Sequence, residues 1–150
     1  MLNKDITIIS PATKKEFNNY YYFRWFYLRK EFSDNIALSK DELEDVSCHV
    51  MAMYKKKIIG VGRIHKVDNQ ISQIRYMAVD SSYQKIGVGS LILSHLIDVA
   101  ISDKQDCIIL HSREHAINFY KKNNFKIVKK SHLLYAKIQH FLMKRELANI

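Results

Sequence analysis

Glycine and proline are scarce in this chain of 150 residues, which contains four glycines and a single proline. With so little of either residue, we expect no low-complexity tract or linker in the chain. The two cysteines, Cys48 and Cys107, lie in separate apolar runs without the spacing of a metal site, so we expect buried free thiols, no disulfide and no metal. No apolar run approaches the ~18 residues of a membrane span, and the N-terminus lacks the apolar segment of a signal peptide. We therefore expect a cytoplasmic protein without a membrane partner.

The composition favours one globular domain. Hydrophobic residues make up 47% of the chain, and 150 residues are enough to bury a core, so we expect a single domain spanning residues 1–150. The formal net charge of +9 is compatible with nucleic acid, an anionic cofactor or solubility alone. Most lysine pairs fall at expected turns or helix ends, which favours a solvated surface over a nucleic-acid partner.

Two of the four glycines lie in segment 84–90, with the sequence QKIGVGS, between an expected strand at residues 71–79 and an expected helix at residues 88–101. Glycine permits a positive φ and leaves backbone N–H groups uncovered, so a ligand can approach closely. The first turn of the following helix adds unpaired N–H groups and the positive end of the helix dipole. The segment therefore predicts a binding site for a phosphate group.

Known phosphate-binding patterns narrow the choice of ligand. No lysine follows Gly89, which excludes a Walker loop, and Ile92 stands where a dinucleotide-binding loop has its third glycine. The remaining pattern, Q/R-x-x-G-x-G/A, is met by Gln84, Gly87 and Gly89. It resembles the pyrophosphate-binding loop of the GNAT N-acetyltransferase superfamily. An ordinary strand-to-helix turn with two glycines also explains this segment.

The periodicity of apolar residues along the rest of the chain predicts a mixed α/β fold. Before the glycine segment we expect a strand at 6–9, a helix at 13–32, an acidic loop at 33–45, and a meander of strands at 46–54, 58–67 and 71–79. After it we expect a buried strand at 107–110, a helix at 114–123, and strands at 125–128 and 138–143.

The first of these helices has two notable features. Thr13 followed by Glu16 predicts a capping box at its N-terminus. It also carries more aromatic residues than one buried face needs, namely Tyr22, Phe23, Phe26 and Tyr27. Three explanations stay open for this surplus: an acceptor pocket, a subunit contact in a homodimer, or ordinary core and amphipathic surface.

A second motif strengthens the resemblance. Residues 116–125, with the sequence AINFYKKNNF, are similar to the A-x-x-F-Y-x-x-x-G-F segment of GNAT enzymes and follow the glycine segment as in that family. The order of strands and helices also matches, so the resemblance covers residues 6–143. It implies an α/β fold with a mostly antiparallel sheet, a splayed parallel pair of strands and helices on both faces. Arg24 with Phe26, and His140 with Met143, resemble the ElaA-like branch.

The resemblance implies an acetyl-CoA-dependent N-acetyltransferase whose acceptor is an amine of a small molecule or peptide. The pyrophosphate of acetyl-CoA would bind the segment formed by Gln84, Lys85, Ile86, Gly87, Val88, Gly89 and Ser90. Pantetheine would run beside Met77, Ala78 and Val79, with a backbone N–H near Ala78 stabilising the oxyanion. Asn118 would bond to the cofactor's amide portion, and Tyr120 would protonate the departing thiolate.

Two positions depart from the family pattern. Asn124 replaces a glycine, a change that asparagine tolerates because it adopts the left-handed conformation. Gln73 stands where the family often has a glutamate general base. The candidates for the base are then His111, which we favour, Glu114, His49 and His65.

Two alternatives to the enzyme remain at this stage. Gln73 in place of a base is compatible with a non-catalytic acyl-CoA-binding protein of the same fold. The basic charge and the aromatic first helix are compatible with a nucleic-acid-binding module, although that interpretation leaves the glycine segment without a role. The sequence does not identify the acceptor.

Overall fold

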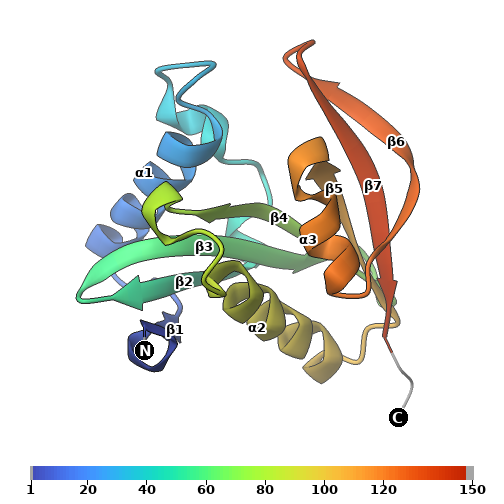
Figure 1. The fold of residues 1–150 in the computed structure, drawn as a ribbon, viewed down its shortest axis with the longest axis horizontal. Coiled ribbons are helices and arrows are strands. Elements are labelled where there is room, and N and C mark those ends of the chain that lie inside the picture. The colour runs from blue at the N-terminus through green and yellow to red at the C-terminus, as the bar shows by residue number, and fades with distance from the viewer. Residues whose placement is uncertain (1, 148–150) are drawn as a thin grey trace.

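The computed structural model describes residues 2–147 and contains a seven-stranded mixed sheet with helices on both faces (Figure 1). The strands follow the order β1-β2-β3-β4-β5-β7-β6. In chain order the elements are β1 Thr7–Ile9, α1 Lys14–Leu28, β2 Cys48–Tyr54, β3 Lys57–Lys66, β4 Ile71–Val79, α2 Val88–Ser102, β5 Cys107–Arg113, α3 Ile117–Lys122, β6 Lys126–Leu134 and β7 Ile138–Glu146. This architecture confirms the predicted α/β fold with its mostly antiparallel sheet.

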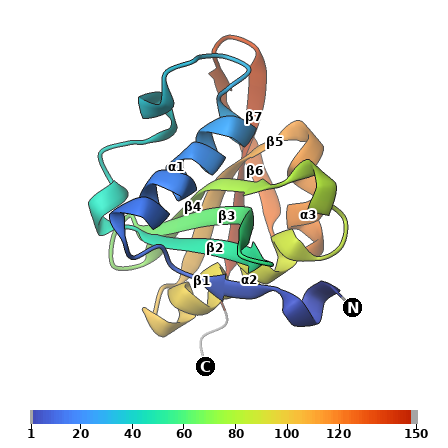
Figure 2. The same cartoon turned by 90° about the vertical axis from the view of Figure 1, so that its left-hand side faces the viewer.

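The two faces of the sheet are covered by different helices. Val50 and Ala52 of β2 pack into the larger core, which contains the buried residues of α2. Met51, which lies between them and therefore points to the other face, packs with Tyr20 and Phe23 of α1. Figure 2 shows α1 lying along its own face of the sheet, with α2 and α3 on the other side. No helix in the described part of the chain has the length and apolarity needed to cross a membrane.

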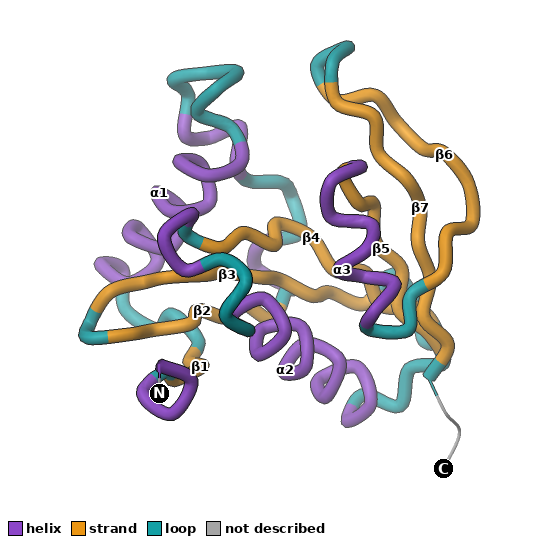
Figure 3. The backbone as a smooth tube through the Cα atoms, in the orientation of Figure 1, coloured by secondary structure: helices purple, strands orange, loops and turns teal. Residues whose placement is uncertain are grey.

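β4 and β5 run in parallel but separate before they end. Their pairing extends from Ile71 opposite Cys107 to Ile74 opposite Leu110. Beyond that point β4 continues to Val79 and β5 to Arg113 without further pairing to each other. Figure 3 shows the two strands diverging. The predicted splay of the parallel pair is therefore present, and it opens towards the loop that follows β4.

A bulge in β4 lies beside this splay. Arg75 pairs with Arg63 of β3 and Ala78 pairs with Val61, so β4 has one more residue than β3 between these pairs. Tyr76 adopts a φ of 58°, in the left-handed region. A bulge bends its strand and takes residues out of the regular ladder, which is common next to active sites. Nothing in the sequence predicted it.

Several element boundaries differ from the sequence prediction. The first helix ends at Leu28 instead of residue 32, because the N–H groups of Arg29 and Lys30 both donate to the carbonyl of Trp25. The helix expected at 114–123 begins as a 3₁₀ turn and is α-helical only over Ile117–Lys122. The strand expected at 125–128 extends over Lys126–Leu134, since this outer strand is mostly exposed and shows no apolar alternation.

Local signals in the sequence were more accurate than these boundaries. Thr13 and Glu16 form the predicted capping box, with the Glu16 N–H donating to Thr13 Oγ1 at 3.1 Å. Asn124 adopts a φ of 69°, which confirms the left-handed conformation expected where it replaces glycine. These features depend on residues close together in the chain, so a short stretch of sequence determines them.

Candidate active site

A cleft of about 1060 Å³ occupies the space where β4 and β5 diverge. Its wall includes the ends of both strands, the loop after β4, the first turns of α2 and α3, and the hairpin of β6 and β7. The end of α1 contributes Leu28 and Arg29 at the side away from the glycine loop. The cleft therefore connects the predicted phosphate site to a pocket between α1 and the β6–β7 hairpin.

The glycine loop has the open backbone that a phosphate site needs. Gly87 precedes α2 and adopts a φ of 97°, a left-handed conformation that costs glycine little. No side chain in the described structure caps the N-terminus of α2, so its first N–H groups are left for a ligand. Gln84 braces the loop, because its Nε2 donates to the carbonyl of Val79 at 3.2 Å.

Gly89 serves the packing of the cleft wall. A Cβ atom built on Gly89 would lie 3.2 Å from the ring of Phe119, which is closer than ordinary van der Waals contact. Glycine at this position lets the first turn of α2 approach α3 across the cleft. The two motifs recognised in the sequence thus meet in space.

The structure brings most of the predicted cofactor-binding residues to the cleft. Those that line it are Met77, Ala78, Val79, Gln84, Lys85, Gly87, Gly89 and Ser90. Val88 instead packs in the core at 1% exposure, while Ile86 and Asn118 are exposed outside the cleft wall. Phe119, Ala116 and Lys122 also line the cleft and were not predicted.

Tyr120 lines the cleft from α3 and is 7% exposed. Its ring packs edge-on against Phe119 and Phe125, with centroid distances of 5.0 and 5.7 Å. Burial raises the pKa of Tyr120 above its ordinary value. The hydroxyl is therefore protonated at neutral pH and can donate a proton to a group in the cleft.

His111 is the first residue of β5 beyond its last pair with β4, and it lines the cleft. Its Nδ1 lies 2.8 Å from the Oγ of Ser131 on β6. Burial lowers the pKa of His111, and the neighbouring His132 and Arg75 lower it further. The ring is therefore neutral near pH 7 and has a nitrogen lone pair that can accept a proton.

The other candidates for a base lie in different places. Gln73 lines the cleft in the position where the resemblance implies a glutamate. Glu114 is exposed and is not part of the cleft wall. His49 and His65 are buried in a separate polar cluster, described below. Of the candidate bases named from the sequence, His111 is the one that the structure places in the cleft.

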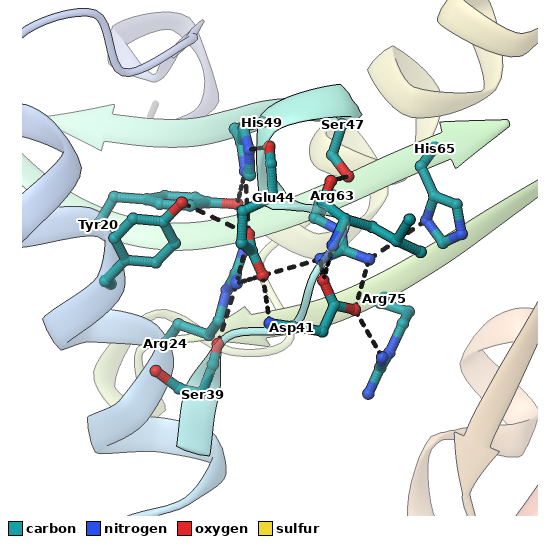
Figure 4. Close-up of polar contacts among 12 residues, drawn as sticks. Tyr20, Arg24, Ser39, Asp41, Glu44, Ser47, His49, Arg63, His65 and Arg75 are labelled. Atoms are coloured by element: carbon teal, nitrogen blue, oxygen red, sulfur yellow. Dashed lines mark hydrogen bonds and ion pairs between the residues drawn. The ribbon is translucent and has the colours of Figure 1, made fainter. Parts of the chain in front are cut away.

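The polar cluster, which we call the arginine cluster, joins α1, the acidic loop and β3 (Figure 4). Arg24 and Arg63 have side chains with 0% exposure, and both donate to the carboxylate of Glu44, at 2.9 and 2.8 Å. Asp41 accepts from Arg63 at 2.7 Å and from Arg75 at 2.8 Å. The remaining members are Tyr20, His49 and His65.

The cluster explains the conformation of the acidic loop at 33–45. Burial raises the pKa of Asp41, but the hydrogen bond from Arg63, the bond from the Leu43 N–H and the nearby arginine charges outweigh it, so the pKa lies well below its ordinary value. A 3₁₀ turn at Glu44–Val46 brings Glu44 to the arginines, which is why β2 begins at Cys48 and not at residue 46. Sequence reasoning treated this loop only as acidic.

Tyr76 connects the arginine cluster to the cleft. Its ring lines the cleft and is 7% exposed. Guanidinium carbons surround the ring centroid at 4.0 Å for Arg24, 4.6 Å for Arg75, 5.0 Å for Arg63 and 5.6 Å for Arg29. Stacking of this kind is favourable when the cation is desolvated. The cluster therefore holds the bulged part of β4 in its position at the cleft.

Several arginine and histidine side chains at the α1 end of the cleft were missed from the sequence. They are Arg29, Arg75, Arg113, His132 and His140. They come from α1, β4, β5 and the β6–β7 hairpin, so no short segment contains a signal that would have grouped them. Of these, only His140 had been noted, as part of the ElaA-like resemblance.

Comparisons with known proteins identify the family. A model of the acetyltransferase (GNAT) family matches residues 10–125. The uncharacterized N-acetyltransferase YjcF of Bacillus subtilis is 29% identical over 126 residues, covering 81% of this chain and 89% of that protein. A GNAT family acetyltransferase from Elizabethkingia anophelis, solved with acetyl-CoA bound, has a TM-score of 0.76 at 17% identity and covers 95% of this chain and 99% of its own. Escherichia coli ElaA has a TM-score of 0.76 at 17% identity, covering 94% and 98%. The chain therefore belongs to the GNAT family of acetyltransferases.

Proposed function

We propose that this protein transfers the acetyl group of acetyl-CoA to a primary amine of a small molecule or peptide, by direct attack of the amine. The observation that carries the proposal is the continuity of the cleft, which joins the glycine loop at the start of α2 to a pocket lined by His111 and Tyr120. A phosphate site and two proton-transfer groups in one cleft are what this reaction requires.

The residues of the cleft fit acetyl-CoA as the donor. The glycine loop and the N-terminus of α2 offer N–H groups to a pyrophosphate, and the exposed Lys85 adds a positive charge. Beyond Ile74, β4 has lost its pairing to β5, so one edge of residues 77–79 is available to the amide groups of pantetheine. An extended ligand can bind along this edge in the manner of an added strand.

Proton transfer is assigned to the two titratable groups named above. An alkylammonium has a pKa near ~10.4, so the acceptor must lose a proton before it attacks. Neutral His111 accepts this proton and releases it to solvent. The amine nitrogen then bonds to the thioester carbon, and the electron pair moves to the carbonyl oxygen. A backbone N–H in the bulged part of β4 stabilises that oxyanion.

Collapse of the tetrahedral intermediate breaks the carbon–sulfur bond. Tyr120, which is protonated at neutral pH, gives its proton to the departing thiolate. The tyrosinate regains a proton from the amide nitrogen, which still carries one proton in excess. The products are the acetylated amine and free CoA, and Tyr120 returns to its starting state.

One observation favours a second candidate function. Gln73 lines the cleft where a carboxylate would serve as base, and an amide side chain does not accept a proton near neutral pH. A protein that binds acyl-CoA without transferring the acyl group is compatible with this residue. The two candidates differ in turnover, not in donor binding.

Thiol release from acetyl-CoA, measured over a panel of amines, polyamines, amino acids and peptides, tests the proposal. We expect release with at least one acceptor, and a fall in kcat of ~10²-fold or more for His111→Gln. His95→Gln is a matched control, since His95 is exposed on α2 outside the cleft wall. Donor binding without release from any acceptor would favour the non-catalytic candidate.

A further inference from the structure

The α1 end of the cleft is lined by arginine side chains from three separate elements. Arg29 follows the last residue of α1, Arg75 lies on β4 and Arg113 ends β5, and all three belong to the cleft wall. His132 and His140 stand beside them, with ring centroids 4.3 Å apart. This part of the cleft lies beyond His111, on the side away from the glycine loop, where the acceptor amine would bind.

The charges of these arginines are unequally compensated. Arg75 donates to Asp41 at 2.8 Å. Among the described residues, Arg29 and Arg113 have no carboxylate within ion-pair distance. Each instead gives one hydrogen bond to the Leu28 carbonyl, at 3.1 Å from Arg29 and 3.0 Å from Arg113. Two guanidinium groups therefore converge on a single carbonyl oxygen at the end of α1.

The unpaired donors of these arginines are accessible to a ligand in the cleft. Arg29 is 9% exposed, yet none of its described nitrogen atoms is both buried and without a hydrogen-bond partner, so its unpaired N–H groups face the cleft. Burial lowers the pKa of Arg29, and the charges of Arg113 and Arg75 lower it further. Burial also lowers the pKa of Arg113. The negative charge of Glu31 raises it, but Glu31 is exposed, so water screens this charge. A guanidinium has five N–H donors, so most of the donors on Arg29 and Arg113 have no protein acceptor in the described structure.

Two contacts join the end of α1 to the opposite wall of the cleft. Phe32, beyond α1, stacks on Tyr135 at the tip of the β6–β7 hairpin, with ring centroids 5.0 Å apart. The bond from Arg113 to Leu28 ties the end of β5 to the end of α1. Because these contacts hold the end of α1 close to β5 and to the β6–β7 hairpin, we expect this end of the cleft to favour a small ligand over a long chain.

We propose that the acceptor is a small amine that also carries an oxyanion, a carboxylate or a phosphate, which Arg29 and Arg113 bind while the amine faces His111. The inference rests on the proposed function and names the class of its substrate. Arginine binds such oxyanions through two parallel hydrogen bonds, which orients the ligand as well as attracting it. Binding of the anion fixes the distance at which the amine meets the base.

The first test measures anion binding directly. Calorimetry on the protein saturated with CoA, with malonate as the titrant, reports the second site because the glycine loop is already occupied. We expect malonate to bind, and Arg113→Gln to weaken binding by ~10- to 100-fold, the effect of losing hydrogen bonds to a charged group. Lys66→Gln is the control, since Lys66 is exposed outside the cleft wall. Equal malonate affinity in the wild type and Arg113→Gln, or no binding to either, overturns the inference.

The second test compares acceptors that differ in the anion alone. We expect O-phosphoethanolamine to exceed ethanolamine in kcat/KM, and β-alanine to exceed propylamine, each by ~10-fold or more. Arg113→Gln should raise KM for the anionic member of each pair by ~10-fold more than for the neutral member. Equal turnover of both members in both pairs overturns the inference and leaves the transferase proposal standing. Thiol release from no amine at all overturns the transferase proposal, and the malonate titration then decides the anion site alone.

Discussion

Glu44→Gln is the change that most directly tests how the arginine cluster holds the fold together. Glu44 accepts two hydrogen bonds from Arg24 at 2.9 Å, one from Arg63 at 2.8 Å and one from the Asp41 N–H at 2.9 Å. Glutamine has the same shape but no charge, and its amide group adds N–H donors where donors already converge. Arg63 would keep the carboxylate of Asp41. Arg24, whose other bonds go to the Ser39 carbonyl and the Tyr20 hydroxyl, would be left without a carboxylate.

The size of the effect follows from this geometry. Breaking a buried ion pair by removing one partner costs ~3–5 kcal/mol, because a buried charge is left uncompensated. Arg24 and Arg63 each already have an Nε without a partner in the described structure, so neither has spare acceptors to turn to. We expect a loss of about 3 kcal/mol in the free energy of unfolding, and a fall in Tm of about 6–12 °C for a domain of this size.

Urea denaturation followed by circular dichroism is the appropriate assay, since guanidinium chloride would screen the charges under test. The midpoint should fall while the m-value stays constant. Glu42→Gln is the matched control, because Glu42 is exposed on the same loop, and its effect should stay within ~0.5 kcal/mol. A loss below about 1 kcal/mol for Glu44→Gln would refute the reasoning, because the buried charges would then be compensated by other means.

Two further predictions concern the cleft. Tyr120→Phe keeps the ring packing and removes the hydroxyl, so kcat should fall by ~10- to 1000-fold with little change in acetyl-CoA affinity; an unaltered kcat would remove Tyr120 from the mechanism. The pKa of His140 is lowered from a usual 6.5 to about 4, mainly by burial and to a lesser extent by the charges of the neighbouring His132 and Arg113. Because the unfolded chain binds the proton more readily, the stability due to neutral His140 is complete above pH 6.5 and is lost as the pH falls towards 4. His140→Gln should therefore reduce the slope of unfolding free energy against pH in that window, and an identical slope in the variant would contradict the assignment.

The part of the site that depends on neighbouring residues could be predicted from the sequence. Gly87 marks a residue in the left-handed conformation, and Gly89 marks the close contact between α2 and α3. The spacing of apolar residues after these glycines predicts the helix α2. Asn124 gave the left-handed turn after α3 in the same way. Such features are determined within a few residues, because backbone sterics and helix periodicity act locally.

The part that depends on distant residues could not be predicted. Arg24 was noted in the sequence only for its resemblance to the ElaA-like branch, and only the folded loop brings Glu44 to it. Arg29 and Arg113 are separated by most of the chain and meet at Leu28 because β5 ends beside α1. The bulge at Tyr76 has no sequence signal, because tyrosine rarely adopts a positive φ. It does so here where the buried Arg24 and Arg63 pack around its ring.

Calorimetric titration with acetyl-CoA is the measurement that tests the central claim, namely that the glycine loop binds the pyrophosphate of the donor. We expect the wild type to bind, Gln84→Ala to bind more weakly, and Gly87→Glu to lose binding, because a side chain and a negative charge would occupy the anion's position. Gly87→Asn separates backbone strain from charge, since asparagine tolerates the left-handed φ of 97° without adding a charge, and it should retain more affinity than Gly87→Glu. A Gly87→Glu variant that stays folded and binds acetyl-CoA with wild-type affinity would contradict the account.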